Sequence, residues 1–139
     1  MSEPRLWIVE APHSLDALQR FRESLSAVWL EHPEIPTSIQ IEISIASAEI
    51  AANIVEHSGM TCSGKIRMEV AIYSEEVRVR FFDNGRELDI DLDSVRLPHE
   101  LAERGRGLAL ARAVLSQLYY ERCAQRCNCW TLISERFSA

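Results

Sequence analysis

Three polar side chains recur at four-residue intervals near the middle of the chain, at Glu49, Asn53 and His57. Four residues advance a helix by about one turn, so these side chains would share one helix face. A solvated stripe on an amphipathic helix has the same spacing. Asparagine, however, is a poor helix former, and Asn53 stands between apolar neighbours. Because a buried amide needs partners, the pattern also fits a helix that presents polar groups to a ligand.

A second polar group follows an apolar run, where Asp83 and Gly85 come directly after Phe81 and Phe82. An Asn-Gly turn between paired strands would account for the glycine. No strand pattern follows for many residues, however, so a hairpin is not the natural interpretation. A carboxylate at the end of a strand, beside a glycine that admits a flat ligand, suits the recognition of adenine.

The third group is Arg104-Gly105-Arg106-Gly107-Leu108, at the start of a predicted helix. Glycines there let backbone N–H groups approach a phosphate, and the helix dipole favours the anion. The arginines add fixed positive charge. The segment lacks the Gly-Lys-Ser/Thr ending of a P-loop, and no strand leads directly into it as in a Rossmann turn.

The spacing of apolar residues predicts the elements that must position these groups. Helices are indicated by apolar residues three to four apart, and strands by short apolar runs or by alternation of polar and apolar residues. The third helix, which runs from Gly107, carries the phosphate-binding candidates at its start. The predicted strands are 6–9, 65–72, 76–82, 119–123 and 130–137, and the predicted helices are 15–28, 37–57 and 107–118.

This order predicts an α/β (α+β) two-layer sandwich, formed by a single domain over residues 1–139. Three helices would cover one face of a mixed, mostly antiparallel sheet. A second apolar stripe at Ile41 and Ile45 predicts that the helix over 37–57 is heavily buried. The stretch 84–104 lacks periodicity, and loops of this length in small domains are usually functional.

The charge balance narrows the function. The 139 residues include 15 basic and 21 acidic side chains, a formal net charge of −6. An acidic chain without a Lys/Arg cluster is a poor candidate for binding nucleic acid or an anionic membrane. No unbroken apolar run approaches the roughly 18 residues of a membrane span, and residues 1–10 lack the pattern of a signal peptide. We therefore expect a cytoplasmic protein with reduced cysteines.

Two patterns suggest further metal sites but have simpler explanations. The acidic run 89–93 resembles an EF-hand loop, but Ser94 occupies the position that requires glycine. Three cysteines lie close together at Cys123, Cys127 and Cys129. The sequence shows no fourth zinc ligand at a compatible position, so we interpret them as small strand residues.

Taken together, the three polar groups resemble the N box, the Asp-x-Gly box and the Gly-x-Gly box of the GHKL (Bergerat-type) ATPase superfamily. Their order and separations both match, and the likeness covers nearly the whole chain. It is closest to the small bacterial anti-sigma-factor serine/threonine kinases. The resemblance implies a histidine-kinase-like ATPase fold, Mg²⁺ and ATP as ligands, and protein kinase activity.

The resemblance assigns roles by position. Glu49 would be the general base that accepts the proton of a serine hydroxyl, and Asn53 would ligate Mg²⁺ on ATP. Asp83 would hydrogen-bond the adenine amino group, with Gly85 beside it. The phosphates would be bound at Arg104, Gly105, Arg106, Gly107 and Leu108, where the two glycines form the cradle.

Three further assignments follow from the same resemblance. The loop 84–104 would be the ATP lid, and Thr131 would support Asp83 from a late strand. His57 would lie near the phosphates, or it would only be a cation favoured by the helix C-terminus. The chain departs from the family pattern at Glu87, which replaces the second glycine of the Asp-x-Gly-x-Gly box, and near Asn128, where a glycine is expected before the last strand.

Two functions are compatible with these features. The first is an anti-sigma factor that holds a sigma factor and phosphorylates a small STAS-type antagonist, as in partner-switching systems, and that forms a homodimer like its relatives. The second is an ATP-binding regulatory module that transfers no phosphate. Glu49 favours the kinase, and Glu87 favours the binding module.

Overall fold

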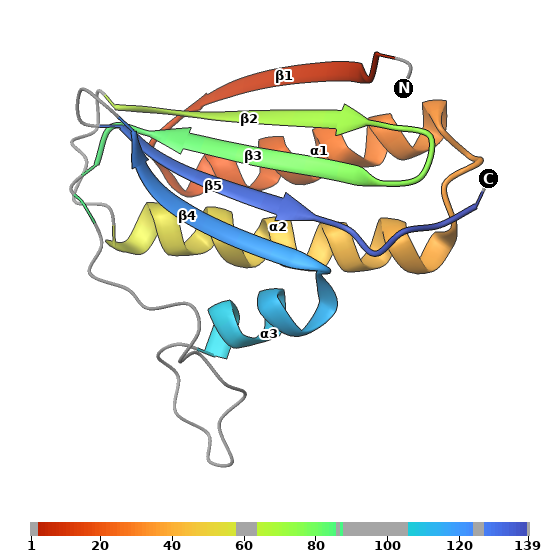
Figure 1. Cartoon of the computed structure of the whole chain (residues 1–139). Coiled ribbons are helices and arrows are strands. Elements are labelled where there is room, and N and C mark those ends of the chain that lie inside the picture. Colours follow the sequence, from red (N-terminus) through yellow and green to blue (C-terminus); the bar gives the residue numbers. More distant parts are fainter. Residues whose placement is uncertain (1–2, 58–63, 86, 88–105, 124–126, 139) are drawn as a thin grey trace.

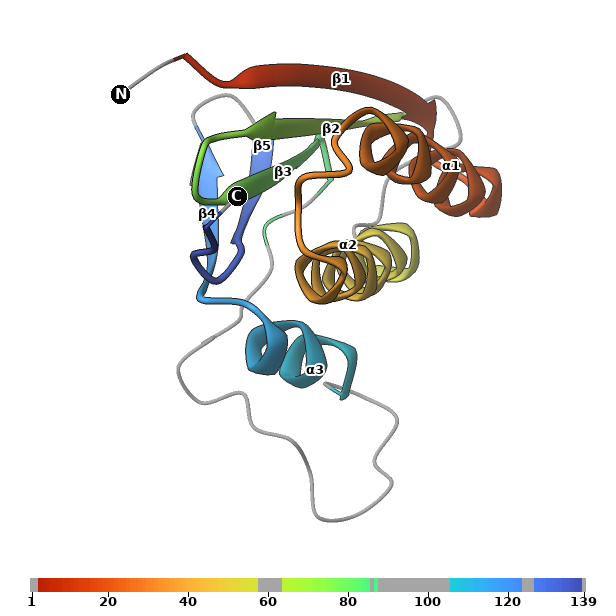
Figure 2. The same cartoon turned by 90° about the vertical axis from the view of Figure 1, so that its right-hand side faces the viewer.

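The computed structural model describes residues 3–57, 64–85, 87, 106–123 and 127–138, and within them five strands form one sheet with three helices on one face (Figures 1 and 2). The strands are β1 (Arg5–Pro12), β2 (Lys65–Ile72), β3 (Val77–Asp83), β4 (Gln117–Cys123) and β5 (Cys127–Ile133). The helices are α1 (Leu15–Glu31), α2 (Thr37–His57) and α3 (Arg106–Val114). The predicted two-layer α+β sandwich with three helices is confirmed.

The sheet has the strand order β1-β2-β3-β5-β4, and every neighbouring pair is antiparallel. The prediction that the sheet is mixed is therefore wrong, because its five described strands form only antiparallel pairs. Two successive helices connect β1 to β2, so the chain returns to the end of the sheet where β1 finished. The single helix α3 does place β4 in the same direction as β3, but β5 lies between them and runs opposite to both.

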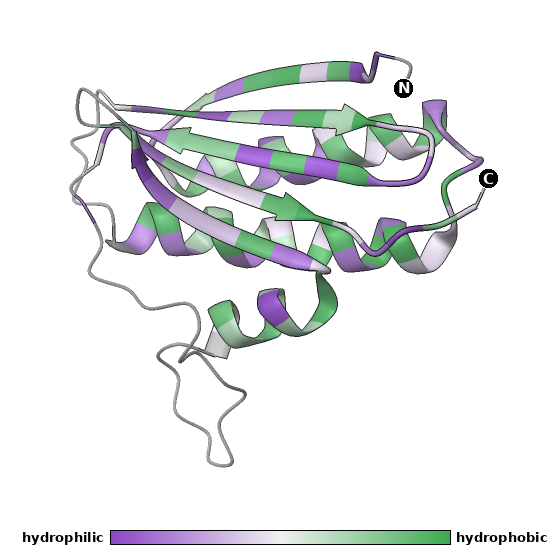
Figure 3. Ribbon diagram, in the orientation of Figure 1, coloured by the Kyte–Doolittle hydropathy of each residue, from purple (hydrophilic) through white to green (hydrophobic). Residues whose placement is uncertain are grey.

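Alternation along the central strands separates the core from the outer face of the sheet. Residues of β2 and β3 alternate between buried and more exposed positions, and Figure 3 shows the same alternation as a change of hydropathy along both strands. Buried side chains of β3 meet the helices, as in the edge-on contact of Phe81 with Phe21 of α1, with ring centroids 5.5 Å apart. The core thus lies between the sheet and the helices.

Helix α2 is the central helix of the layer, and Figure 2 shows it between α1 and α3. Its predicted apolar stripe is buried, at Ile39, Ile43, Ala46, Ile50 and Ile54. The second predicted stripe is exposed instead, with 53% of Ile41 and 37% of Ile45 accessible to solvent. A helix at the outer surface of a two-layer fold has only one sheet to cover it, so one flank stays open.

By length and composition alone, α2 also resembles a membrane span, since residues Thr37–Glu56 have a mean hydropathy of 1.2. One such helix is weak evidence for a membrane protein, because core helices pass the same test. The stripe packed against the sheet accounts for this hydropathy without a membrane.

The ends of the later elements differ from the predicted ones. Helix α3 ends at Val114 instead of residue 118, and β4 begins at Gln117. Leu118 lies four residues after Val114, which is a helical spacing, and two residues before Tyr120, which is a strand spacing; all three are partly buried against the core. The last strand ends at Ile133 instead of residue 137, although Ser134 still donates its backbone N–H to the carbonyl of Val77 in β3.

Candidate nucleotide-binding site

The described members of the three polar groups lie towards one end of the molecule. Helix α2 ends there, β3 ends there, and α3 begins there, at the left of Figure 1. Helix α2 packs against both α3 and β3. The fold therefore brings the Glu49–Asn53 face of α2, the Asp83 end of β3 and the start of α3 to one region.

Glu49 lies directly against the start of α3. A Cβ built on Gly107 would overlap Glu49 Oε2 and would lie 3.3 Å from its Cδ. Only glycine leaves room for the carboxylate at this position. Glu49 and Asn53 are both half-buried, and because they are one turn apart they share the flank of α2 that faces α3. Two oxygen-donor side chains thus stand beside the first turn of α3.

The carboxylate of Asp83 is held in a buried network. Asp83 is only 3% exposed, and its Oδ1 accepts the backbone N–H of Gly85 at 2.8 Å and the side-chain N–H of Asn128 at 3.0 Å. An ionised carboxylate has about four acceptor positions. The two bonds fix the orientation of the Asp83 side chain, and the carboxylate can still accept a hydrogen bond from the amino group of a ligand.

Asn128 is in turn oriented by strand β4. Its Oδ1 accepts the hydroxyl of Tyr120 at 2.6 Å and Nη1 of Arg122 at 2.9 Å. The same Arg122 nitrogen donates to the carbonyl of Gly85 at 2.6 Å, and Asn128 Nδ2 lies 3.3 Å from that carbonyl. The turn after β3 is thereby tied to both strands of the β4–β5 pair.

The predicted support of Asp83 by Thr131 is wrong. Asp83 pairs in register with Asn128, whereas Thr131 pairs with Arg80. Thr131 borders a hollow together with Leu6 and Arg80, on the face of the sheet opposite the three described helices. Sequence reasoning missed Asn128, and the available signal was an asparagine, a residue depleted in strands, between apolar strand residues.

Some predicted residues lie wholly or partly outside the described part of the chain. Arg104 and Gly105 lie outside it, as do residue 86 and residues 88–104 of the predicted lid. Their roles stay predictions. Arg106 and His57 are described as the first residue of α3 and the last of α2. Leu108 is 9% exposed and packs in the core, so its side chain anchors the start of α3.

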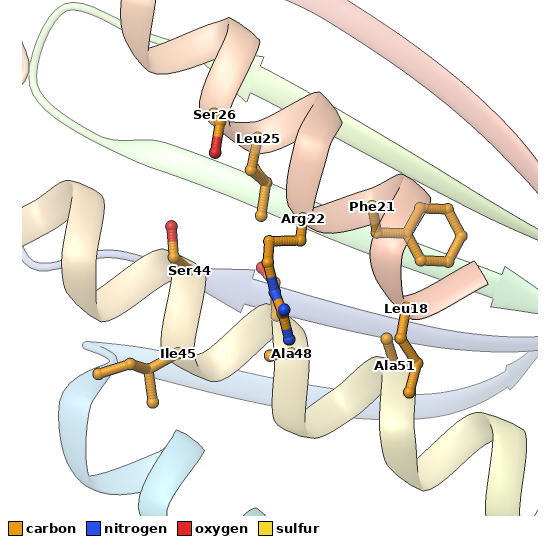
Figure 4. A pocket seen from close by; sticks show the side chains of 10 residues that line it. Leu18, Phe21, Arg22, Leu25, Ser26, Ser44, Ile45, Ala48 and Ala51 are labelled. Atoms are coloured by element: carbon orange, nitrogen blue, oxygen red, sulfur yellow. The ribbon is translucent and has the colours of Figure 1, made fainter. Parts of the chain in front are cut away.

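A second hollow lies between α1 and α2, away from these groups. Figure 4 shows Arg22 of α1 extending towards Ala48 of α2, with Leu18 and Ile45 also lining the groove. Ala48 is on the flank of α2 that faces α1, whereas Glu49 is on the flank that faces α3. The groove is therefore separate from the candidate nucleotide site.

Comparison of the sequence with known protein families gives a match to the family described as "Histidine kinase-like ATPase domain", over residues 11–134. The chain belongs to the histidine kinase-like ATPase family. This match confirms the resemblance to GHKL ATPases that the three boxes indicated, and members of this family bind ATP, usually with Mg²⁺. A comparison with curated protein sequences finds no significant match.

Two solved structures illustrate the similarity of the fold. The structure of the RsbU and RsbW domains of Rv1364c from Mycobacterium tuberculosis aligns with a TM-score of 0.67 and 20% identity, covering 95% of this chain and 32% of that one. The catalytic domain of histidine kinase ThkA, in a nucleotide-free form, aligns with a TM-score of 0.57 and 12% identity, covering 96% of this chain and 99% of that one. The present chain spans about a third of the Rv1364c chain, and both similarities concern the fold.

Proposed function

We propose that this chain is a Mg²⁺- and ATP-dependent protein serine/threonine kinase that acts as a bacterial, cytoplasmic anti-sigma factor. Its substrate would be a STAS-type antagonist, and its second partner a sigma factor. The family match supports ATP binding, and the similar fold of a chain that contains an RsbW domain supports a partner-switching role. The observation that carries the kinase assignment is the position of Glu49 at the start of α3.

The residues present fit a bound Mg²⁺ and nucleotide. Asn53 supplies a side-chain oxygen of the kind that Mg²⁺ accepts. Glu49 Oε2 lies where a side chain at position 107 would project, and the backbone N–H groups at the start of α3 would bind an anion as those of other helix N-termini do. When bound, Mg²⁺ neutralises charge on the phosphates during transfer.

The chain's own groups have separate tasks in this mechanism. Asp83, fixed by Gly85 and Asn128, binds and orients the adenine amino group. Asn53 would hold the metal. Glu49 would orient the incoming serine hydroxyl and accept its proton on a carboxylate oxygen while the hydroxyl oxygen attacks the terminal phosphorus of ATP. The bond from that phosphorus to the bridging oxygen breaks, and ADP leaves.

Phosphorylation would release the antagonist through charge. A phosphate adds about −1.5 to −2 charge at neutral pH, and the chain already carries a formal net charge of −6. The modified antagonist would be repelled, and the chain would then hold the sigma factor instead. A homodimer, as in related anti-sigma factors, belongs to this proposal.

Phosphotransfer assays on two variants of α2 test the proposal. Glu49→Gln preserves the size of the side chain that packs on Gly107 but removes the base. We expect it to bind ADP as wild type does and to phosphorylate the antagonist more slowly by on the order of 10²–10⁴-fold. Asn53→Ala should also lose Mg²⁺-dependent ATP binding. The matched control is Glu42→Gln, two turns earlier on the same helix, which should behave as wild type.

The outcomes separate the kinase from a binding module. If Glu49→Gln transfers phosphate as fast as wild type, Glu49 is not the base. If the wild-type chain binds Mg·ATP but phosphorylates no STAS-type protein, the chain is an ATP-binding regulatory module, the function that Glu87 favours. If calorimetry detects no Mg²⁺-dependent binding of ATP or ADP at millimolar concentration, both functions are excluded.

A further inference from the structure

Strands β4 and β5 place four metal-ligating side chains on the outer face of the sheet. Glu121 pairs in register with Cys129, and the next pair on the same face is Cys123 with Cys127. The intervening residue Asn128 points to the opposite face, where it contacts Asp83. The four ligands therefore form two adjacent cross-strand pairs, which is an arrangement the linear sequence does not display.

The ligand atoms lie close enough to share one ion. One carboxylate oxygen of Glu121 and the sulfurs of Cys123 and Cys129 are all within 4.8 Å of one another. In a tetrahedral zinc site with Zn–S bonds of about 2.3 Å, the sulfurs are roughly 3.8 Å apart. The three groups therefore need to approach by about 1 Å or less. Cys127, the cross-strand partner of Cys123, lies outside this group. Its thiol donates to the carbonyl of Asn128 at 3.6 Å, so it would have to turn towards the ion to serve as the fourth ligand.

We propose that Glu121, Cys123, Cys127 and Cys129 bind a thiophilic metal ion, for which Zn²⁺ is the best fit. Sulfur ligands select Zn²⁺ over Mg²⁺ or Ca²⁺, and three sulfurs with one carboxylate complete a tetrahedral set. Solvent access decreases across the cluster, from exposed Glu121 through half-buried Cys123 to buried Cys129. An ion can thus enter from solvent and be held against the sheet.

The surroundings of the cluster keep the free thiols of Cys127 and Cys129 protonated, so a metal ion has to displace their protons when it binds. Burial, together with Cys123 alongside, raises the pKa of Cys127 to about 11, and burial also raises the pKa of Cys129. Thiols of high pKa are poor nucleophiles at neutral pH. Arg80 interacts electrostatically with Cys129, and its positive charge would offset the negative charge that remains when anionic ligands surround a divalent ion.

The site would act on the candidate nucleotide site through one residue. Asn128 lies between two of the ligands, Cys127 and Cys129, and its side chain holds Asp83 from the opposite face. An ion on the outer face would fix this short segment of β5 and, with it, the amide that orients the adenine-binding carboxylate. This consequence rests on the proposed nucleotide function, whereas metal binding itself does not.

Metal titration of the 139-residue chain tests the site directly. The chain is reduced, freed of reductant and metal, and titrated with Cd²⁺, whose thiolate bonds absorb in the ultraviolet, and separately with Zn²⁺ against a chromogenic chelator. We expect one ion per chain and an absorbance that corresponds to three thiolates. Cys129→Ser and Glu121→Gln should each weaken binding by at least about tenfold, the least that loss of an outer-sphere partner costs.

Matched controls remove other thiols and carboxylates. Cys62→Ser removes the remaining cysteine of the chain, and Glu135→Gln removes an exposed glutamate after the end of β5; both should bind metal as wild type does. Because Cys129 is buried, its serine variant is first checked for folding by circular dichroism. If Cys129→Ser does not fold, Glu121→Gln carries the test, because that side chain is exposed.

Three outcomes would overturn the proposal. The first is absence of stoichiometric Cd²⁺ and Zn²⁺ binding by the reduced wild-type chain. The second is binding that persists unchanged in both ligand variants or is abolished by Cys62→Ser. The third is a reduced chain that binds no metal but forms a Cys123–Cys127 disulfide on air oxidation, with the loss of two hydrogens by mass spectrometry. None of these measurements depends on nucleotide, so failure here leaves the proposed kinase function untouched.

Discussion

Replacing Asn128 by alanine would remove the group that holds the end of β3 to the β4–β5 pair. The side chain is 1% exposed, and it bonds to Asp83, Gly85, Tyr120 and Arg122. Its bond to the Asp83 carboxylate is charge-assisted, and bonds to charged groups contribute roughly 1.5–3 kcal/mol each. Leaving buried partners unsatisfied adds a similar cost.

We therefore expect Asn128→Ala to lower the free energy of unfolding by about 2–4 kcal/mol. Urea denaturation followed by tryptophan fluorescence suits the measurement, because Trp130 is buried on the same strand and stacks at a tilt on Tyr120. Calorimetry at a temperature where the variant stays folded should show an ADP affinity reduced by on the order of tenfold. This corresponds to a loss of about 1.4 kcal/mol of binding free energy, because Asp83 is no longer held in the orientation that binds adenine.

Thr131→Ala is the matched control, since it also shortens a polar side chain on β5 but on the outer face. Its unfolding free energy should stay within about 0.5 kcal/mol of wild type, and ADP binding should not change. Asn128→Asp keeps the shape but places a second carboxylate beside Asp83, so it should also weaken ADP binding. Equal effects of Asn128→Ala and Thr131→Ala would refute the assignment of Asn128 as the residue that orients Asp83.

Two further predictions concern contacts elsewhere in the molecule. Gly107→Ala should displace the Glu49 carboxylate from the start of α3 but change the unfolding free energy by no more than about 1 kcal/mol, because the displaced atom ends a flexible side chain and alanine is the better helix former. A loss above about 2 kcal/mol that Glu49→Ala does not relieve would mean that something other than Glu49 is displaced. The second prediction concerns the alkylation of Cys127 by iodoacetamide in the metal-free chain. The thiolate is the reactive form, and the pKa of this thiol is raised to about 11. The alkylation rate should therefore be slow at pH 8 and increase about tenfold per pH unit up to about pH 11. A rate by peptide mass spectrometry that levels off near pH 9 would contradict the raised pKa.

The elements that could be predicted from the sequence are those fixed by local pattern. Helix α2 was predicted with its observed bounds, because a long apolar stripe at helical spacing has no competing interpretation. Strands β2 and β3 alternate over seven or eight residues. The boundary between α3 and β4 was misplaced, because Leu118 continues the helical spacing from Val114 and also fits an inward strand position.

The errors within the site have a different cause, which is strand register. Both Asn128 and Thr131 are polar residues of β5, and the sequence does not indicate which of them faces Asp83. The answer depends on the pairing of β3 with β5, between residues about 45 positions apart, where a shift of one residue exchanges the two faces of the strand. The exposure of Ile45 similarly depends on which flank of α2 is covered by α1.

The same register explains how one short segment of β5 can serve two sites. Successive strand residues point to opposite faces, so Asn128 must face the helices if its neighbours Cys127 and Cys129 face outwards. On the inner side, Asn128 connects Asp83 with Tyr120 and Arg122 of β4. On the outer side, the cysteines meet Cys123 and Glu121 of that same β4 strand. Any ligand that fixes β4 against β5 from the outside therefore also fixes the residues that orient Asp83, and this coupling needs no movement of the helices.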